Sequence, residues 1–150
     1  MCTAGTEIRP VTTLRDAQIM RGIRNECRSY MTNDTSYISF FRQARWWRKV
    51  KNDPNWWLYL FWYNGSPIGY GIIRKKDMYW VSGGIIAQSR GHGFGRHLFS
   101  FLTQVATNGH SAYLEVLKTN ERAFNLYQSL GYRVCCADMD GVLLMRADPS

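Results

Sequence analysis

The stretch Gln88-Ser89-Arg90-Gly91-His92-Gly93-Phe94-Gly95 decides the fold of this chain. It ends an apolar, strand-like run and opens a helix-like run in which one face carries Phe94, Leu98, Phe101, Leu102 and Val105. A glycine-rich turn before a helix leaves several backbone N–H groups unpaired, and the helix dipole adds partial positive charge there. The three glycines have no side chain that would keep a phosphate at a distance. The stretch therefore predicts a phosphate-binding loop, whereas a short glycine-rich turn alone is more often only a turn.

A second segment, residues 114–132, repeats the pattern of a buried strand followed by a helix. Together the two segments resemble the GCN5-related N-acetyltransferase (GNAT) family. The family signature Q/R-x-x-G-x-G/A is matched by Gln88, Gly91 and Gly93. Its second signature is matched by Asn120, Ala123, Leu126-Tyr127 and Gly131-Tyr132. The resemblance is specific over about residues 78–134 and only architectural before them.

The length of 150 residues predicts one domain over residues 1–150. Periodicity and turn signals predict the order β-α-α-β-β-β-α-β-α-β-β. The first helix is expected to bury Ile19, Ile23, Cys27 and Tyr30, and the second Phe40, Ala44, Trp47 and Val50. Residues 56–63 read as a strand covered on both faces, and Asn64-Gly65 predicts a hairpin turn. The resemblance implies an α/β fold, a mixed sheet with helices on both faces. In that family the strands on either side of the glycine-loop helix splay apart and hold the pantetheine arm. Gly83-Gly84 is expected either to form a bulge that helps this opening or to be ordinary flexible strand.

Composition limits the class of protein and its partners. Hydrophobic residues make up 45% of the chain, which indicates a globular protein, and no apolar run reaches the length of about 20 residues that a membrane span needs. The N-terminus shows no secretory signal, so we expect a cytoplasmic protein whose four cysteines are free thiols. The His and Cys residues show no metal-ligand spacing, so no metal site is expected. Nineteen Lys and Arg against eleven Asp and Glu give a charge of +8, which favours anionic partners.

The resemblance implies that acetyl-CoA is the cofactor and that its pyrophosphate lies on backbone N–H groups from about Gly91 to Arg96. Arg90 and Arg96 are expected to add charge at the rim or to be solvated surface residues. Backbone groups near Ile86 are expected to pair with the pantetheine. The full set of expected cofactor-binding residues is Ile85, Ile86, Gln88, Arg90, Gly91, His92, Gly93, Phe94, Gly95, Arg96, Asn120, Ala123 and Tyr127.

Acetyl transfer to an amine requires a proton donor for the sulfur and a base for the amine. The resemblance implies that Tyr127 is the donor. A tyrosine, with an ordinary pKa of about 10, carries its proton at neutral pH; the alternative is a core aromatic residue. The candidates for the general base are Glu115 and Glu26, with Asp34 as a third option and a backbone carbonyl acting through water as a fourth. His92 lies inside the phosphate loop and is interpreted as a surface residue.

The resemblance implies that the acceptor site is formed by the first two helices, their connecting loop and the last hairpin, where the family varies. Its expected lining residues are Tyr30, Tyr37 and Trp47, with Trp46 as a further candidate. The resulting hypothesis is an N-acetyltransferase that moves acetyl from acetyl-CoA to a primary amine by direct attack in a ternary complex. The amine belongs to a small molecule, an amino sugar or a protein, and the basic charge of the chain is compatible with an anionic acceptor. Two alternatives follow from the basic charge: acylation of a nucleic acid, such as a charged tRNA, or a non-catalytic nucleic-acid-binding module. A monomer or a homodimer is compatible with the sequence.

Overall fold

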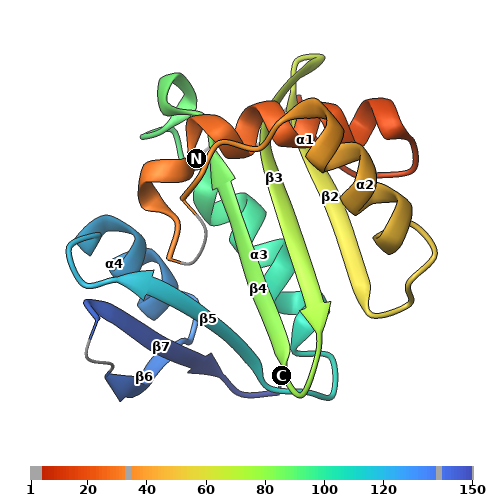
Figure 1. Cartoon of the computed structure of the whole chain (residues 1–150). Helices are drawn as coiled ribbons and strands as arrows, with labels where there is room; N and C mark the ends of the chain where they lie inside the picture. Colours follow the sequence, from red (N-terminus) through yellow and green to blue (C-terminus); the bar gives the residue numbers. More distant parts are fainter. Residues whose placement is uncertain (1–4, 33–34, 138–139, 150) are drawn as a thin grey trace.

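The computed structural model describes residues 5–32, 35–137 and 140–149 (Figure 1). Its elements follow one another in the predicted order, with two short 3₁₀ turns added. They are β1 (Thr6–Pro10), α1 (Leu14–Glu26), η1 (Arg28–Tyr30), α2 (Phe40–Val50), β2 (Trp56–Tyr63), β3 (Ser66–Lys75), β4 (Tyr79–Ile85), η2 (Ala87–Ser89), α3 (Phe94–Ala106), β5 (Ala112–Leu117), α4 (Glu121–Ser129), β6 (Arg133–Ala137) and β7 (Val142–Ala147). The predicted fold class is confirmed.

The strands form one mixed sheet in the order β1-β2-β3-β4-β5-β7-β6. All neighbours are antiparallel except β4 and β5, which run parallel. The predicted hairpin between β2 and β3 is confirmed. Its turn residues Asn64 and Gly65 both have positive φ, 49° and 80°, which matches the right-handed twist of the strands that they join.

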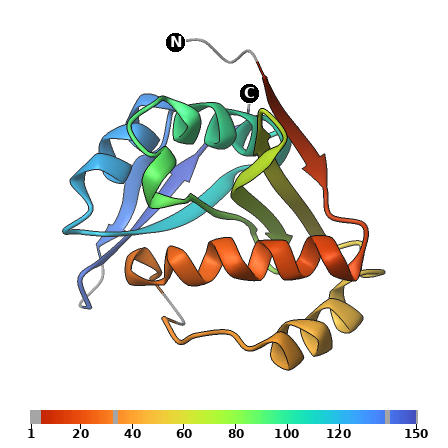
Figure 2. The ribbon, with the colours of Figure 1, turned by 90° about the horizontal axis from the view of Figure 1, so that it is seen from above.

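Helices cover both faces of this sheet, as Figures 1 and 2 show. Helices α1 and α2 lie on one face, where the buried amide of Gln43 donates a hydrogen bond of 2.7 Å to the carbonyl of Ala17. Helices α3 and α4 lie on the other face. Among the described residues, no helix combines the length and the apolar character that crossing a bilayer requires.

The buried faces of three helices differ from the prediction in phase. In α3, Phe94, Leu98 and Leu102 are buried as expected, but Phe99, Thr103 and Ala106 complete the face and Phe101 and Val105 are only half-buried. Tyr30 is exposed because α1 ends at Glu26 and the chain then tightens into η1. In α2, Phe40 is exposed and Gln43 is buried in its place. Periodicity located the helices correctly, and tertiary packing fixed their rotation.

The glycines of β3 and β4 allow close packing of the helices. The β3–β4 register is regular through Gly83 and Gly84, so the expected bulge is absent there; a register shift lies instead at Phe61/Trp62 of β2. A Cβ atom on Gly84 would lie 2.9 Å from the Sγ atom of Cys27 in the turn that ends α1. Gly84 therefore serves the contact between α1 and the strand.

The parallel contact between β4 and β5 is short. Only Tyr79 with Ala112 and Trp80 with Tyr113 are paired, although both strands continue for several residues. The expected splaying of these two strands is confirmed, and the gap between them lies in the middle of the sheet (Figure 1).

The cysteines of the described residues are free thiols, as predicted: Cys27 is buried, and Cys135 and Cys136 are exposed. Cys2 lies outside the described residues.

Candidate active site

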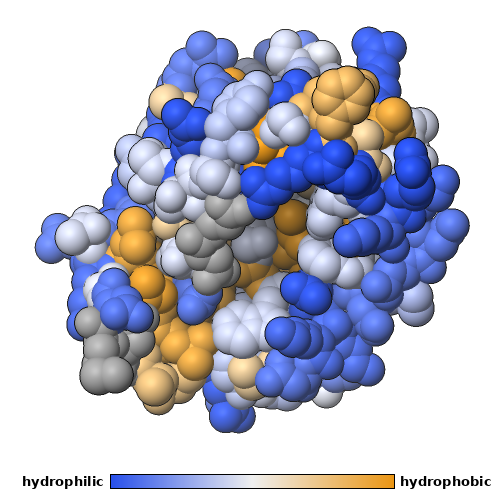
Figure 3. All heavy atoms as spheres, in the orientation of Figure 1, coloured by the Kyte–Doolittle hydropathy of each residue, from blue (hydrophilic) through white to orange (hydrophobic). Residues whose placement is uncertain are grey.

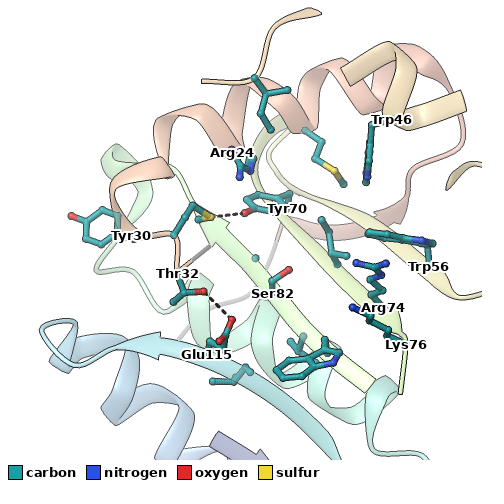
Figure 4. Close-up of a pocket in the computed structure, with 18 of the residues that line it drawn as sticks. Arg24, Tyr30, Thr32, Trp46, Trp56, Tyr70, Arg74, Lys76, Ser82 and Glu115 are labelled. Carbon is teal, nitrogen blue, oxygen red and sulfur yellow. Dashed lines mark hydrogen bonds between the residues drawn. The ribbon is translucent and has the colours of Figure 1, made fainter. Parts of the chain in front are cut away.

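A cavity of about 840 Å³ opens on the face that carries α1 and α2. Figure 3 shows this face, where hydrophilic side chains surround a recess with apolar atoms in it. Strand pairing arranges the cavity floor in rows. Trp56, Arg74 and Trp80 are paired across β2, β3 and β4 and form one row at the β3–β4 hairpin end; Ile72 with Ser82 forms the next. Figure 4 shows Trp56, Arg74 and Ser82 directed into the cavity, and Ile72 and Trp80 also belong to its lining.

Glu115 lies on the far side of the gap. It is two residues beyond Tyr113, which pairs with Trp80, so it stands level with Ser82 and points to the same face of the sheet. The hydroxyl of Thr32, just after η1, donates a hydrogen bond of 3.3 Å to Glu115 Oε1 (Figure 4). Of the two carboxylates proposed as bases that the structure describes, Glu115 lines the cavity, whereas Glu26 is exposed on α1 and does not. Asp34 lies outside the described residues.

The cavity passes through the sheet at the gap. Its lining includes Val81, Gly83 and Leu114, whose positions alternate with those of Ser82 and Glu115, and it includes Tyr127 of α4 on the other face. The Tyr127 ring packs edge-on against Phe99 of α3, with ring centres 5.0 Å apart. Burial raises the pKa of Tyr127 well above its ordinary value, so its phenol carries a proton throughout the neutral range. A carboxylate and a protonated phenol thus line one cavity from opposite sides of the sheet.

The glycine loop leaves a helix start without a side-chain cap. Helices α1, α2 and α4 begin with Thr13, Ser39 and Asn120, each of which accepts a hydrogen bond from a backbone N–H of the first turn. The residue at this position before α3 is instead Gly93, which has φ 82° and no capping side chain. Gly91 has φ 84°, in the same left-handed region. In the described part of the chain, none of the backbone N–H groups of residues 91–96 donates a hydrogen bond. This set of donors fits an anion such as a diphosphate.

The end of β4 supplies a second row of backbone groups. The N–H of Ile86 donates to the carbonyl of Ile68 at 2.9 Å, so this donor is already engaged in the sheet. Because successive residues of a strand alternate, the backbone groups of Gly83 and Ile85 point the other way, toward the gap. Donors for the pantetheine are therefore available at Gly83 and Ile85 and not at Ile86.

Arg90 points inward from the loop. Its Nε donates to the carbonyl of Ile85 at 2.9 Å, its Nη2 lies 3.6 Å from Cys27 Sγ, and its guanidinium lies 4.4 Å from the ring centre of Tyr30. Arg96 donates to the hydroxyl of Ser129 at 3.0 Å and so links α3 to α4. Neither arginine extends freely from the rim. Burial raises the pKa of the Cys27 thiol despite the nearby guanidinium, so the thiol is neutral.

The remaining predicted cofactor residues lie around the loop. Gln88 and His92 are exposed, and His92 Nδ1 lies 3.2 Å from the carbonyl of Ser89. Phe94 is buried in the core, and Gly95 faces Leu126 of α4. Asn120 Oδ1 accepts from the Ala123 N–H at 3.2 Å as the cap of α4, which leaves its amide nitrogen available.

Sequence reasoning missed one basic residue at the loop. Arg122 of α4 comes so close to Gly91 that a Cβ there would lie 3.3 Å from its Nη2. The signal was its position two residues after Asn120, inside the second family signature. The residue adds a cation beside the unpaired amides.

The predicted acceptor residues are only partly brought together. Tyr30 lines the cavity. Tyr37 is 58% exposed and its hydroxyl accepts a hydrogen bond from Arg21, and Trp47 is 9% exposed in the core; neither lines the cavity. The neighbouring Trp46 lines it instead. Sequence reasoning did not find Trp56, Arg74, Trp80 and Ser82, whose alternation along the strands was the available signal.

Comparisons with known proteins agree with this geometry. The profile of the acetyltransferase (GNAT) family matches residues 18–132. No curated protein matches the chain in sequence. Among solved structures, spermidine N-acetyltransferase from Vibrio cholerae in complex with CoA and spermine has a TM-score of 0.79 at 20% identity, covering 96% of this chain and 95% of that chain. A putative acetyltransferase from Salmonella typhimurium with acetyl-CoA has a TM-score of 0.79 at 19% identity, covering 97% and 95%.

A putative phosphinothricin N-acetyltransferase has a TM-score of 0.80 at 20% identity, covering 97% of this chain and 99% of that chain. These likenesses show the shared fold, and the profile match covers most of the chain, including the glycine loop and the segment around Tyr127. The chain therefore belongs to the GNAT family of acetyltransferases and is an acetyl-CoA-dependent N-acetyltransferase.

Proposed function

We propose that the protein acetylates the primary amine of a small acceptor that binds in the cavity on the α1–α2 face, by direct attack within a ternary complex. The observation that carries the proposal is the passage of one cavity through the gap between β4 and β5, with Glu115 and Tyr127 both in its lining. Donor and acceptor then approach from opposite faces of the sheet and meet where the strands separate.

The residues that hold the donor follow from the unpaired backbone groups. The N–H groups of residues 91–96 bind the diphosphate, with Arg122 beside them, and the backbone of Gly83 and Ile85 pairs with the pantetheine arm. Acetyl-CoA supplies the activated acetyl group, as a thioester. The Asn120 amide nitrogen is a further donor at this end.

Two side chains manage the protons. Glu115 removes a proton from the acceptor's ammonium, directly or through water, and the hydroxyl of Thr32 orients its carboxylate. The phenol of Tyr127 holds the proton that the departing sulfur requires, and its raised pKa keeps that proton in place at neutral pH. Glu26 has no part in this arrangement because it lies outside the cavity.

The polyamine named for the Vibrio cholerae structure is not proposed for this chain. Among the residues that the structure describes, the cavity lining holds four basic side chains, Arg24, Arg42, Arg74 and Lys76, against the two acidic side chains of Asp77 and Glu115. A polycation is therefore a poor match to its charge.

The test is acetyl-CoA-dependent thiol release with a panel of primary amines, with the acetylated product identified by mass spectrometry and with a protein-only reaction as the control for hydrolysis. Acetylated product from at least one amine supports the proposal. Thiol release that does not depend on any amine, together with no acetylated product across the panel, contradicts it.

A further inference from the structure

We infer that the acceptor carries an anionic group, a carboxylate or a phosphate, at a distance from its amine, and that Arg74 and Lys76 bind this group. The inference rests on the proposed function for the position of the amine. It concerns the outer end of the cavity, at the β3–β4 hairpin, which acetyl transfer itself does not require.

In the part of the chain that the structure describes, the basic residues at this end have no carboxylate partner. Within the described ranges, neither Arg74 nor Lys76 forms an ion pair, and the Asp77 carboxylate beside them accepts a hydrogen bond from the Met78 N–H at 3.0 Å. Arg24 and Arg42 are different, because each donates to Ser36, at 3.2 and 3.0 Å. Some guanidinium donors of Arg24 and Arg42 are thus engaged within the protein, whereas the cationic groups of Arg74 and Lys76 are directed to a ligand in the cavity.

Aromatic rings hold Arg74 in place. Its guanidinium lies 4.6 Å from the ring centre of Trp56, and the Trp56 ring in turn meets Trp46 edge-on, with centres 5.7 Å apart. A guanidinium stacked on an indole keeps its edge free for two parallel hydrogen bonds to a carboxylate or a phosphate. Trp80, which is paired with Arg74 in the sheet, adds an apolar wall for the carbon chain of the acceptor.

The strand register sets the spacing between the two groups. Arg74 is two residues from Ile72, whose partner Ser82 is level with Glu115. Two residues of a strand span about 7 Å. The amine at Glu115 and the anion at Arg74 therefore need a spacer between them. This geometry disfavours an anion directly beside the amine and favours an ω-amino acid or an aminoalkyl phosphate.

The experiment compares four amines of equal chain length: ε-aminocaproate, aminohexyl phosphate, hexylamine and hexamethylenediamine. We expect kcat/KM for at least one of the two anionic amines to exceed that for the diamine by about tenfold or more, with hexylamine between them. Comparison of ε-aminocaproate with aminohexyl phosphate shows whether the site prefers a carboxylate or a phosphate. The same order is expected in calorimetric affinities measured on the CoA-loaded protein.

Arg74→Gln should remove the preference for the anionic amine, so that the ratio of its kcat/KM to that of hexylamine falls to about one. Lys75→Gln is the matched control: it removes the same charge from the adjacent residue of β3, whose side chain points to the opposite face of the sheet. This control should keep the preference. Arg74→Glu should reverse the preference, so that kcat/KM for the diamine exceeds kcat/KM for the anionic amine.

The outcomes separate the two proposals. If the diamine binds and reacts as well as the anionic amines, or if Arg74→Gln and Lys75→Gln behave alike, the anion site is wrong while acetyl transfer stands. If no amine is acetylated but an anionic amine still binds more tightly than the diamine in an Arg74-dependent manner, the anion site stands and the proposed function is wrong.

Discussion

Trp80 of β4 and Tyr113 of β5 are the last residues to pair across the parallel contact of the sheet, with ring centres 5.9 Å apart. Beyond them the strands diverge, so residues of both sheet faces line the same cavity. Glu115 and Tyr127 thereby line one cavity, although the Glu115 side chain projects from one face of the sheet and Tyr127 belongs to α4 on the other face.

Replacement of Tyr127 by Phe removes the phenolic proton and keeps the packing against Phe99. We expect kcat to fall by about 10²-fold or more while the affinity for acetyl-CoA changes little, because the hydroxyl acts on the departing sulfur. Steady-state kinetics and calorimetry measure the two quantities. The control is Tyr132→Phe, a neighbouring buried tyrosine whose hydroxyl bonds to Thr103 and not to the cavity; it should keep kcat. An unchanged rate in Tyr127→Phe would remove this residue from the mechanism.

Gly93→Asp places a carboxylate beside the unpaired amides at the start of α3. We expect the dissociation constant of acetyl-CoA to rise by at least about tenfold, through repulsion of the diphosphate and loss of space. Gly109→Asp is the matched control. It imposes the same substitution at φ 83°, has no neighbouring atom within 4 Å of the added Cβ, and lies beyond the other end of α3. Equal affinity in the two variants would show that the diphosphate binds elsewhere.

Glu115→Gln and Glu26→Gln distinguish the two acidic candidates for the base. General-base removal costs about 10²- to 10⁴-fold in rate, so Glu115→Gln should lower kcat/KM for the acceptor in that range. Glu26→Gln should remain within about twofold, because its side chain is exposed and outside the cavity. The pH–rate profile of each variant adds a second readout, since a lost base also removes its ionisation from the profile. The reverse ranking of the two variants would transfer the role to Glu26.

Gly84→Ala brings a methyl group to 2.9 Å from Cys27 Sγ, and α1 must shift to accommodate it. We expect the free energy of unfolding to fall by about 1–3 kcal/mol in urea denaturation. The double variant with Cys27→Ala should recover part of this loss, because removing the sulfur relieves the clash. Strictly additive effects in this double-mutant cycle would mean that the two residues are not in contact.

Buried tyrosines make the fold sensitive to alkaline pH. Burial raises the pKa of Tyr132 to about 12, although the hydrogen bond with Thr103 partly opposes this rise. The unfolded chain loses this proton at about pH 10, so it binds fewer protons than the native state above that pH. The contribution to stability is therefore complete below pH 10 and falls by about 1.4 kcal/mol per pH unit up to about pH 12. Tyr132→Phe should show a shallower decline in urea denaturation over that interval, and an identical slope would contradict the assignment.

The proposed donor site could be located from the sequence because its residues are local. The glycine loop and the segment around Tyr127 are each contiguous, and their family signatures identify them without knowledge of the tertiary structure. One error on this side was of strand parity: the N–H of Ile86 pairs with Ile68, and the adjacent Ile85 faces the gap instead. A second was the omission of Arg122, which reaches Gly91 from α4.

The acceptor side was less predictable because strand pairing and helix rotation assemble it. Arg74 and Trp56 are far apart in sequence and become neighbours only through the β2–β3 register. On α2 a rotation of one position separates Trp46, which lines the cavity, from Trp47, which is in the core. Hydrophobic periodicity does not determine helix rotation to that precision.

The divergence of β4 and β5 also leaves backbone amides in the middle of the sheet without a neighbouring strand, as at a sheet edge. These are the fourth and fifth of seven strands, where deuterium normally enters a folded sheet last. Here the amides of Gly83 and Ile85 have no strand opposite them. We therefore expect these central amides to exchange with deuterium as readily as the amides of an outer strand. Ligand that occupies the opening should then slow labelling at those two amides more than anywhere else in the sheet.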